Sequence, residues 1–221
     1  MDIRTVRKAL VFGFFLAAAA VTGAQAQFTV AAQSGLAFPI VRSADYFEPG
    51  PAFGVLVGYG VHDRIDLVGN GGLDLWKGLG GLGTPDMNLL RFEAGVRAYL
   101  VGERGSGANL QLVATAGATS FGSSEFTRRT TPPLDPDLIN TYNPIIGPAT
   151  FSKTYGSATA GFRVGFFSLD SGLEGSFGVD VHYSPMSTDD TDLLRDARPL
   201  TLRELNSAVS LPITLSIGYA L

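Results

Sequence analysis

The chain has 221 residues, a length that fits one domain or two. Charged residues make up only 16% of it, against about 25% in an ordinary soluble domain, and 45% of it is hydrophobic, so the composition excludes a disordered chain. Cysteine is absent and the net charge is −4. These two facts exclude disulfide scaffolds and thiolate metal sites, and they argue against a nucleic-acid-binding domain.

The N-terminal segment has the three parts of a secretory signal, namely a basic start, an apolar run and a small-x-small cleavage site. These parts are Arg4, Arg7 and Lys8; residues 9–21; and Ala24-Gln25-Ala26. The apolar run has 13 residues. It is too short for a membrane-spanning helix, which needs about 20. We therefore expect residues 1–26 to be a cleaved secretory signal peptide and residues 27–221 to form one domain.

The last part of the chain alternates apolar residues with small or polar ones. One set of positions holds Leu211, Ile213, Leu215, Ile217, Tyr219 and Leu221, and the intervening set holds Ser210, Pro212, Thr214, Ser216, Gly218 and Ala220. A period of two predicts a β-strand with unlike environments on its two sides. The run suits a tilted membrane strand, which needs about 9–11 residues. Pro212 within it requires either a bulge or a missing ladder hydrogen bond.

The same pattern recurs between turn signals, and eight such segments follow residue 27. They span residues 28–41, 51–61, 65–75, 89–101, 109–121, 152–167, 173–184 and 205–221. An even number of consecutive alternating segments predicts an all-β fold, an eight-stranded antiparallel transmembrane up-and-down β-barrel. The alternative fold is a soluble eight-stranded lipocalin, which would turn its apolar face inward around a ligand.

The connections between these segments alternate in length. Short turns cover residues 62–64, 102–108 and 168–172, and the longer loops include residues 77–88, 122–150 and 185–204. Outer-membrane barrels have short periplasmic turns and long extracellular loops, so we expect that orientation here. The loop over 122–150 holds five prolines and the pair Arg128-Arg129. It is the candidate region for binding lipopolysaccharide phosphates, another cell's surface or a partner protein.

The aromatic residues are expected to form two belts at the membrane interfaces, since amphipathic rings settle at the headgroup level. The belt on the turn side would hold Tyr59, Tyr99, Phe166, Phe167 and Tyr219, and the belt on the loop side Phe53, Trp76, Phe92, Phe121, Phe151 and Tyr183.

With these features the chain resembles the small eight-stranded outer-membrane barrels of the OmpA/OmpX type. The closing alternation over 213–221 looks like the C-terminal signal that the outer-membrane assembly machinery reads. The resemblance implies a monomer in the outer membrane of a Gram-negative-type bacterium, in contact with outer-membrane lipids and lipopolysaccharide. It implies little about activity, because the family includes anchors, adhesins, narrow pores and lipid-modifying enzymes.

Charged residues on the polar sides of the strands are expected to face the lumen. They are Asp66, Asp74, Arg91, Glu93, Arg97, Lys153, Arg163, Glu174, Asp180 and His182. An eight-stranded barrel is only wide enough for its own side chains to fill it. The opposite charges should therefore pair across the lumen and plug it, and a narrow passive pore is the alternative.

An enzymatic alternative rests on His182 and Ser184. The triplet that they enclose resembles the His-x-Ser of lipid A 3-O-deacylases, which are eight-stranded outer-membrane hydrolases in which the His acts as base for the Ser. Residues i and i+2 of a strand point to the same side, as activation of the hydroxyl requires. Pro185 departs from that family's pattern, and alternation aims His182 into the lumen. We therefore expect a structural or surface-interaction protein and assign no catalytic residue.

Two further motifs carry no site in this interpretation. The glycine-rich stretch 78–83 matches a dinucleotide-binding pattern, but no helical periodicity follows it, so a loop tip is expected. The aspartates between 189 and 196 lack the ligand spacing of a calcium loop, so a solvated loop is expected. We thus expect neither a cofactor nor a metal.

Overall fold

A computed structural model describes residues 28–79, 85–105, 107–129, 145–168, 171–186 and 207–220. The expected signal peptide, most of the glycine-rich stretch and the aspartates between 189 and 196 lie outside the described residues. No helix in the described part of the chain is long and apolar enough to cross a bilayer.

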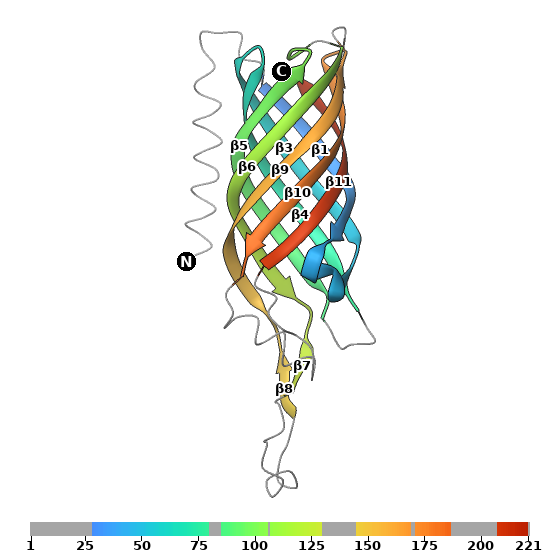
Figure 1. Ribbon diagram of the computed structural model, residues 1–221, viewed down its shortest axis with the longest axis vertical. Coiled ribbons are helices and arrows are strands. Elements are labelled where there is room, and N and C mark those ends of the chain that lie inside the picture. The colour runs from blue at the N-terminus through green and yellow to red at the C-terminus, as the bar shows by residue number, and fades with distance from the viewer. Residues whose placement is uncertain are drawn as a thin grey trace, which may run out of the picture.

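Eight long strands form one closed antiparallel barrel (Figure 1). They are β1 (Phe28–Pro39), β3 (Gly50–His62), β4 (Ile65–Gly78), β5 (Met87–Val101), β6 (Ala108–Ser123), β9 (Ser152–Phe167), β10 (Leu173–Pro185) and β11 (Ser207–Ala220). Each strand pairs with the next along the chain, and β1 pairs with β11 to close the ring. The predicted eight-stranded up-and-down barrel is confirmed, with strand ends within a few residues of those expected.

The two ends of the barrel differ in their connections. Residues 63–64, 102–107 and 168–172 join strands at one end, which we call the turn end. Residues 40–49, 79–86, 124–151 and 186–206 join them at the other, the loop end. The third of these connections contains β7 (Phe126–Arg129) and β8 (Ile145–Ala149), which pair only with each other and extend beyond the barrel (Figure 1).

The two faces of the sheet have opposite polarity. The described part of the chain buries 24 polar or charged residues, nearly all of them at inward positions, whereas large apolar side chains such as Leu215 and Phe162 are exposed on the outside. Because successive side chains point to opposite faces, the period of two in the sequence produces this division directly. A lipocalin would have the reverse arrangement, so the alternative fold is wrong.

The connection between β1 and β3 folds over the loop end as a strap. It contains a short 3₁₀ helix η1 (Val41–Asp45) and β2 (Phe47–Glu48), which pairs with the end of β4. The Ser43 hydroxyl accepts a hydrogen bond from the Val209 N–H at 3.1 Å. Val41 enters the strap at φ 56°, a conformation that costs a β-branched residue about 1–3 kcal/mol. Contacts of the strap with β4 and β11 offset this strain.

The strap contributes Tyr46 and Phe47 to an apolar plug inside the loop end. The plug consists of Ala37, Tyr46, Phe47, Ala52, Trp76, Met87, Leu89, Phe121, Phe151, Met186 and Ala208. Phe47 and Trp76 pack with ring centres 5.4 Å apart. The described part of the lumen is therefore apolar at the loop end and polar between the plug and the turn end.

The expected aromatic belts are wrong for four residues. Trp76, Phe121 and Phe151 belong to the plug, and Tyr99 is 5% exposed at the turn end of the lumen. Trp76 has the same parity as the inward Asp66 on β4, and parity overrides the preference of aromatic rings for interfaces. Other expected members do lie outside: the exposed rings are Phe53, Phe92, Phe166, Tyr183 and Tyr219.

Pro212 causes an interruption rather than a bulge. The β10–β11 pairing stops after Val179–Ile213 and resumes at His182–Ser210 in the same register. Since proline has no N–H to donate, loss of the ladder at this point is the expected consequence. The second of the two predicted outcomes is confirmed.

The plug makes a prediction for Phe47, which packs against the only tryptophan of the chain. Phe47→Ala should lower the free energy of unfolding by about 3–5 kcal/mol, because it leaves a cavity in a packed apolar cluster. It should also shift Trp76 fluorescence emission to longer wavelength, because water gains access to the ring. Phe53→Ala is the control, since Phe53 is outward and 49% exposed. An unchanged Trp76 emission in Phe47→Ala would contradict the packing described.

Candidate functional site

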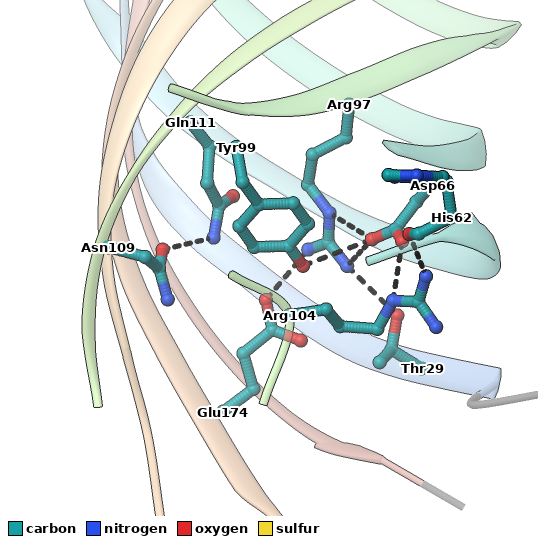
Figure 2. A network of polar contacts seen from close by, with 9 residues as sticks. All are labelled: Thr29, His62, Asp66, Arg97, Tyr99, Arg104, Asn109, Gln111 and Glu174. Carbon is teal, nitrogen blue, oxygen red and sulfur yellow. Dashed lines mark hydrogen bonds and ion pairs between the residues drawn. The ribbon is translucent and has the colours of Figure 1, made fainter. Parts of the chain in front are cut away.

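The turn end of the lumen contains a network of polar side chains centred on Arg97 (Figure 2). Arg97, on β5, is 2% exposed. Its Nε and Nη2 donate to Asp66 Oδ2 at 2.8 and 2.6 Å, and its Nη1 donates to Glu174 Oε1 at 2.7 Å. Nη2 also donates to Thr29 Oγ1 at 3.3 Å. One guanidinium thus joins β5 to β4, β10 and β1.

Tyr99 and Arg104 complete this Arg97 network. The Tyr99 hydroxyl donates to Asp66 Oδ2 at 3.0 Å, and Arg104 Nε donates to Asp66 Oδ1 at 2.8 Å. Arg104 Nη2 also donates to the backbone oxygen of His62. Because Arg104 lies between β5 and β6 and His62 ends β3, these contacts tie two turns together across the turn end (Figure 2).

Two glycines of β3 make room for these guanidinium groups. A Cβ at Gly60 would collide with the guanidinium of Arg104, and a Cβ at Gly58 would collide with Thr29 Oγ1 and lie 3.2 Å from Arg97 Nη2. The sequence shows these glycines only as the small face of a strand. It also places Arg104 in a polar turn, where arginine is ordinary, so sequence reasoning missed its role.

Two further ion pairs cross-link strands nearer the middle of the lumen. Arg163 Nη2 lies 3.0 Å from Asp180 Oδ2, and Arg91 Nη2 lies 2.8 Å from Asp74 Oδ1. All four side chains are at most 6% exposed. The prediction that opposite charges pair inside the barrel is confirmed.

Lys153 is the exception among the predicted lumen charges. It is exposed, as are its neighbours Ser152 and Thr154 on both sides of the strand. This part of β9 lies at the loop end, where alternation no longer separates a lumen from an outer face. The prediction of an inward Lys153 is therefore wrong.

His182 lies fully buried in a cluster of hydroxyl groups. Its Nε2 is 3.2 Å from Thr119 Oγ1, and its Nδ1 is 2.9 Å from Thr159 Oγ1. The same Nδ1 lies 3.4 Å from Glu93 Oε1. Ser157 Oγ also donates to that carboxylate, at 2.9 Å. Both ring nitrogens of His182 thus face other partners than Ser184.

Ser184 is also fully buried, and its hydroxyl donates to the Gly156 carbonyl oxygen at 3.0 Å. A nucleophile and its base need a mutual hydrogen bond. The described contacts of His182 and Ser184 do not form one. Within the described ranges, no group of three or more His, Asp or Glu is placed to hold a metal ion.

No protein-family model matches the chain, and no curated protein sequence matches it. Among solved structures, Neisserial surface protein A superposes with a TM-score of 0.53 at 12% identity, over 87% of this chain and 96% of that one. Ail of Yersinia pestis gives a TM-score of 0.45 at 12% identity, over 89% and 97% of the two chains. A major outer membrane protein from Thermus thermophilus gives 0.49 at 13% identity, over 89% and 99%. The chain therefore has the fold of Neisserial surface protein A.

The Arg97 network predicts a large loss of stability when its central charge is removed. Arg97→Met leaves Asp66 and Glu174 buried with fewer positive partners. We expect the free energy of unfolding to fall by about 3–5 kcal/mol, as for a buried pair that loses one member. Urea titration of the folded protein in vesicles measures this loss.

The matched control is the exposed pair of Arg64 and Glu103, whose side chains are 59% and 56% exposed at a separation of 3.6 Å. Arg64→Met should cost about 0–1 kcal/mol, because water already screens that pair. Equal losses in the two arginine variants would mean that the lumen charges are hydrated and that the network does not hold the barrel together.

Proposed function

We propose that this chain is an integral outer-membrane β-barrel of a Gram-negative-type bacterium. Its role in this proposal is structural or one of surface interaction, through the connections at the loop end, and it is not enzymatic. The observation that carries the proposal is the polarity of the barrel, which is apolar outside and polar inside.

The outer face supports the membrane position. Large apolar side chains are exposed on seven of the eight barrel strands, including Val30, Phe53, Leu67, Phe92, Val164, Phe177 and Ile217. Soluble monomers rarely expose apolar patches of more than a few hundred Å², whereas a bilayer requires such a band. The closed ladder also leaves no barrel strand with an unpaired edge, which hydrocarbon could not satisfy.

The lumen favours a plugged barrel over a passive pore. At the turn end, Arg97 on β5 bonds across the lumen to Glu174 on β10 and also to Asp66 on β4. At the loop end, Phe47 and Trp76 fill the interior. Channels of the porin type have about 16–18 strands. The separate contacts of His182 and Ser184 likewise give the hydrolase alternative no support.

The loop end is the part of the molecule suited to a partner. β7 and β8 form their own two-stranded sheet, separate from the barrel ladder. Binding residues are commonly carried on loops that a rigid scaffold positions. Because Arg128 and Arg129 lie in β7, we expect the partner to be anionic. We propose lipopolysaccharide phosphates as the ligand.

Shortening the connection between β6 and β9 tests whether the barrel strands are sufficient for insertion and this connection is needed for binding. Replacing residues 126–149 by a short Gly-Ser turn should leave insertion intact, because β6 pairs directly with β9 and loop length changes stability only slowly. The shortened protein should stay in the membrane fraction after a carbonate wash and migrate differently on a gel when boiled. It should lose binding to lipopolysaccharide micelles.

The matched variant for binding is Arg128→Gln with Arg129→Gln in the full chain. It should lose most of the same binding without any change in insertion. If both altered proteins bind the micelles as well as the original does, the surface role proposed for this connection is wrong. If the shortened protein fails to insert, the segment belongs to the barrel.

A further inference from the structure

One row of outward positions crosses four neighbouring strands without a side chain larger than a methyl group. Gly69 pairs with Ala94, Ala94 with Ala116, and Ala116 with Ala158. Adjacent strands lie about 4.8 Å apart, so this small-residue row is about 14 Å long.

Larger residues flank the row at its β4–β5 end. Leu67 and Val96 lie in register on its turn-end side, and both are exposed. Phe92 lies on its loop-end side and is 48% exposed. The part of the row on β4 and β5 therefore lies lower than the side chains around it on the outer face of the barrel.

A hollow of about 680 Å³ opens at the Gly69 end of the row. Its lining consists of Phe28, Val57, Tyr59, Leu67, Val68, Gly69, Ala94 and Gly95. A Cβ at Gly69 would meet no atom within 4 Å, so the missing side chain leaves open space there. The volume falls in the range of about 300–1,000 Å³ that ligand sites occupy.

The lining selects a hydrocarbon occupant. It holds no charged side chain, and its hydroxyl-bearing member is Tyr59, near the turn end of β3. Tyrosine prefers the level of the lipid headgroups, with its ring toward the hydrocarbon. A chain that enters beside Tyr59 would lie against the apolar side chains of the lining, including Val57, Leu67 and Ala94.

A second copy of the chain fits the hollow less well. A two-fold interface must be self-complementary, but here a concave floor would face another concave floor. The lining is also too small for a stable dimer, which buries about 800 Å² on each partner through some 20–30 residues.

We propose that this hollow binds one acyl chain of a membrane phospholipid from the leaflet that faces the short turns. The inference rests on the proposed function, because the outer face meets lipid only if the barrel spans a membrane. Lipid elsewhere on the barrel exchanges freely, whereas the chain in the hollow is held by contacts on several sides.

Photo-crosslinking in vesicles tests the proposal. The full chain is inserted into phosphatidylethanolamine and phosphatidylglycerol vesicles that contain phosphatidylcholine with a diazirine in mid-chain, and labelled positions are found by mass spectrometry. Labelling should be concentrated at Val57, Leu67 and Ala94. It should clearly exceed labelling at Val181 and Ile217, which are exposed on the outer face of β10 and β11.

Two variants fill the hollow and one serves as a matched control. Gly69→Leu and Ala94→Leu should each abolish the excess labelling, and either suffices if the other folds poorly. Gly156→Leu adds the same side chain to the outer face of β9, where the nearest atom to a Cβ is 4.0 Å away. It should leave the excess unchanged.

The outcomes separate the two proposals. Even labelling around an inserted barrel, or excess labelling that survives both filling variants, overturns the acyl-chain site while the membrane barrel stands. A stable dimer that Gly69→Leu dissociates also overturns it, because a second copy would then occupy the hollow. A protein that stays outside the vesicles with no labelled position overturns the proposed function itself.

Discussion

Pairing of β1 with β11 closes the sheet, with eleven residue pairs from Thr29–Ala220 to Pro39–Ser210. Once the ring is closed, each side chain of a barrel strand points either into a narrow lumen or out to the surroundings. Closure also pairs the two edge strands, so that the backbone ladder needs no help from water except at the interruption beside Pro212. The paired charges in the lumen and the apolar outer surface both follow from which residues are assigned to which of these two faces.

The charges inside the barrel help to fix that assignment. Asp66 lies directly opposite Arg97 in the β4–β5 pairing, and Arg97 reaches on to Glu174 on β10. A slip of one residue would move one strand's whole set of inward side chains to the outer face. Because an unpaired buried charge costs several kcal/mol, the ion pairs penalise such slips.

Much of this architecture is readable from the sequence, because a period of two needs only side-chain polarity to be detected. The strands and nearly all of the lumen charges follow from it. The plug does not, although Trp76 and Phe121 share parity with inward polar residues of their strands. Their assignment to interfacial belts relied on residue type. Their position in the alternation instead determines that they face the lumen. Phe47 and Arg104 lie in connections, which have no periodicity to read, so their roles emerge only from the folded chain.

The most direct test of this inside-out polarity is to measure how much stability an introduced charge costs at two depths on the outward face of one strand. Leu215 is 62% exposed near the middle of the barrel wall, and Val209 faces outward close to the loop end of the same strand. In a bilayer, Leu215→Arg should cost about 2–4 kcal/mol and Val209→Arg about 0–1 kcal/mol. Equal or negligible costs at the two positions would mean that the outer face meets water, and they would contradict the membrane-spanning barrel.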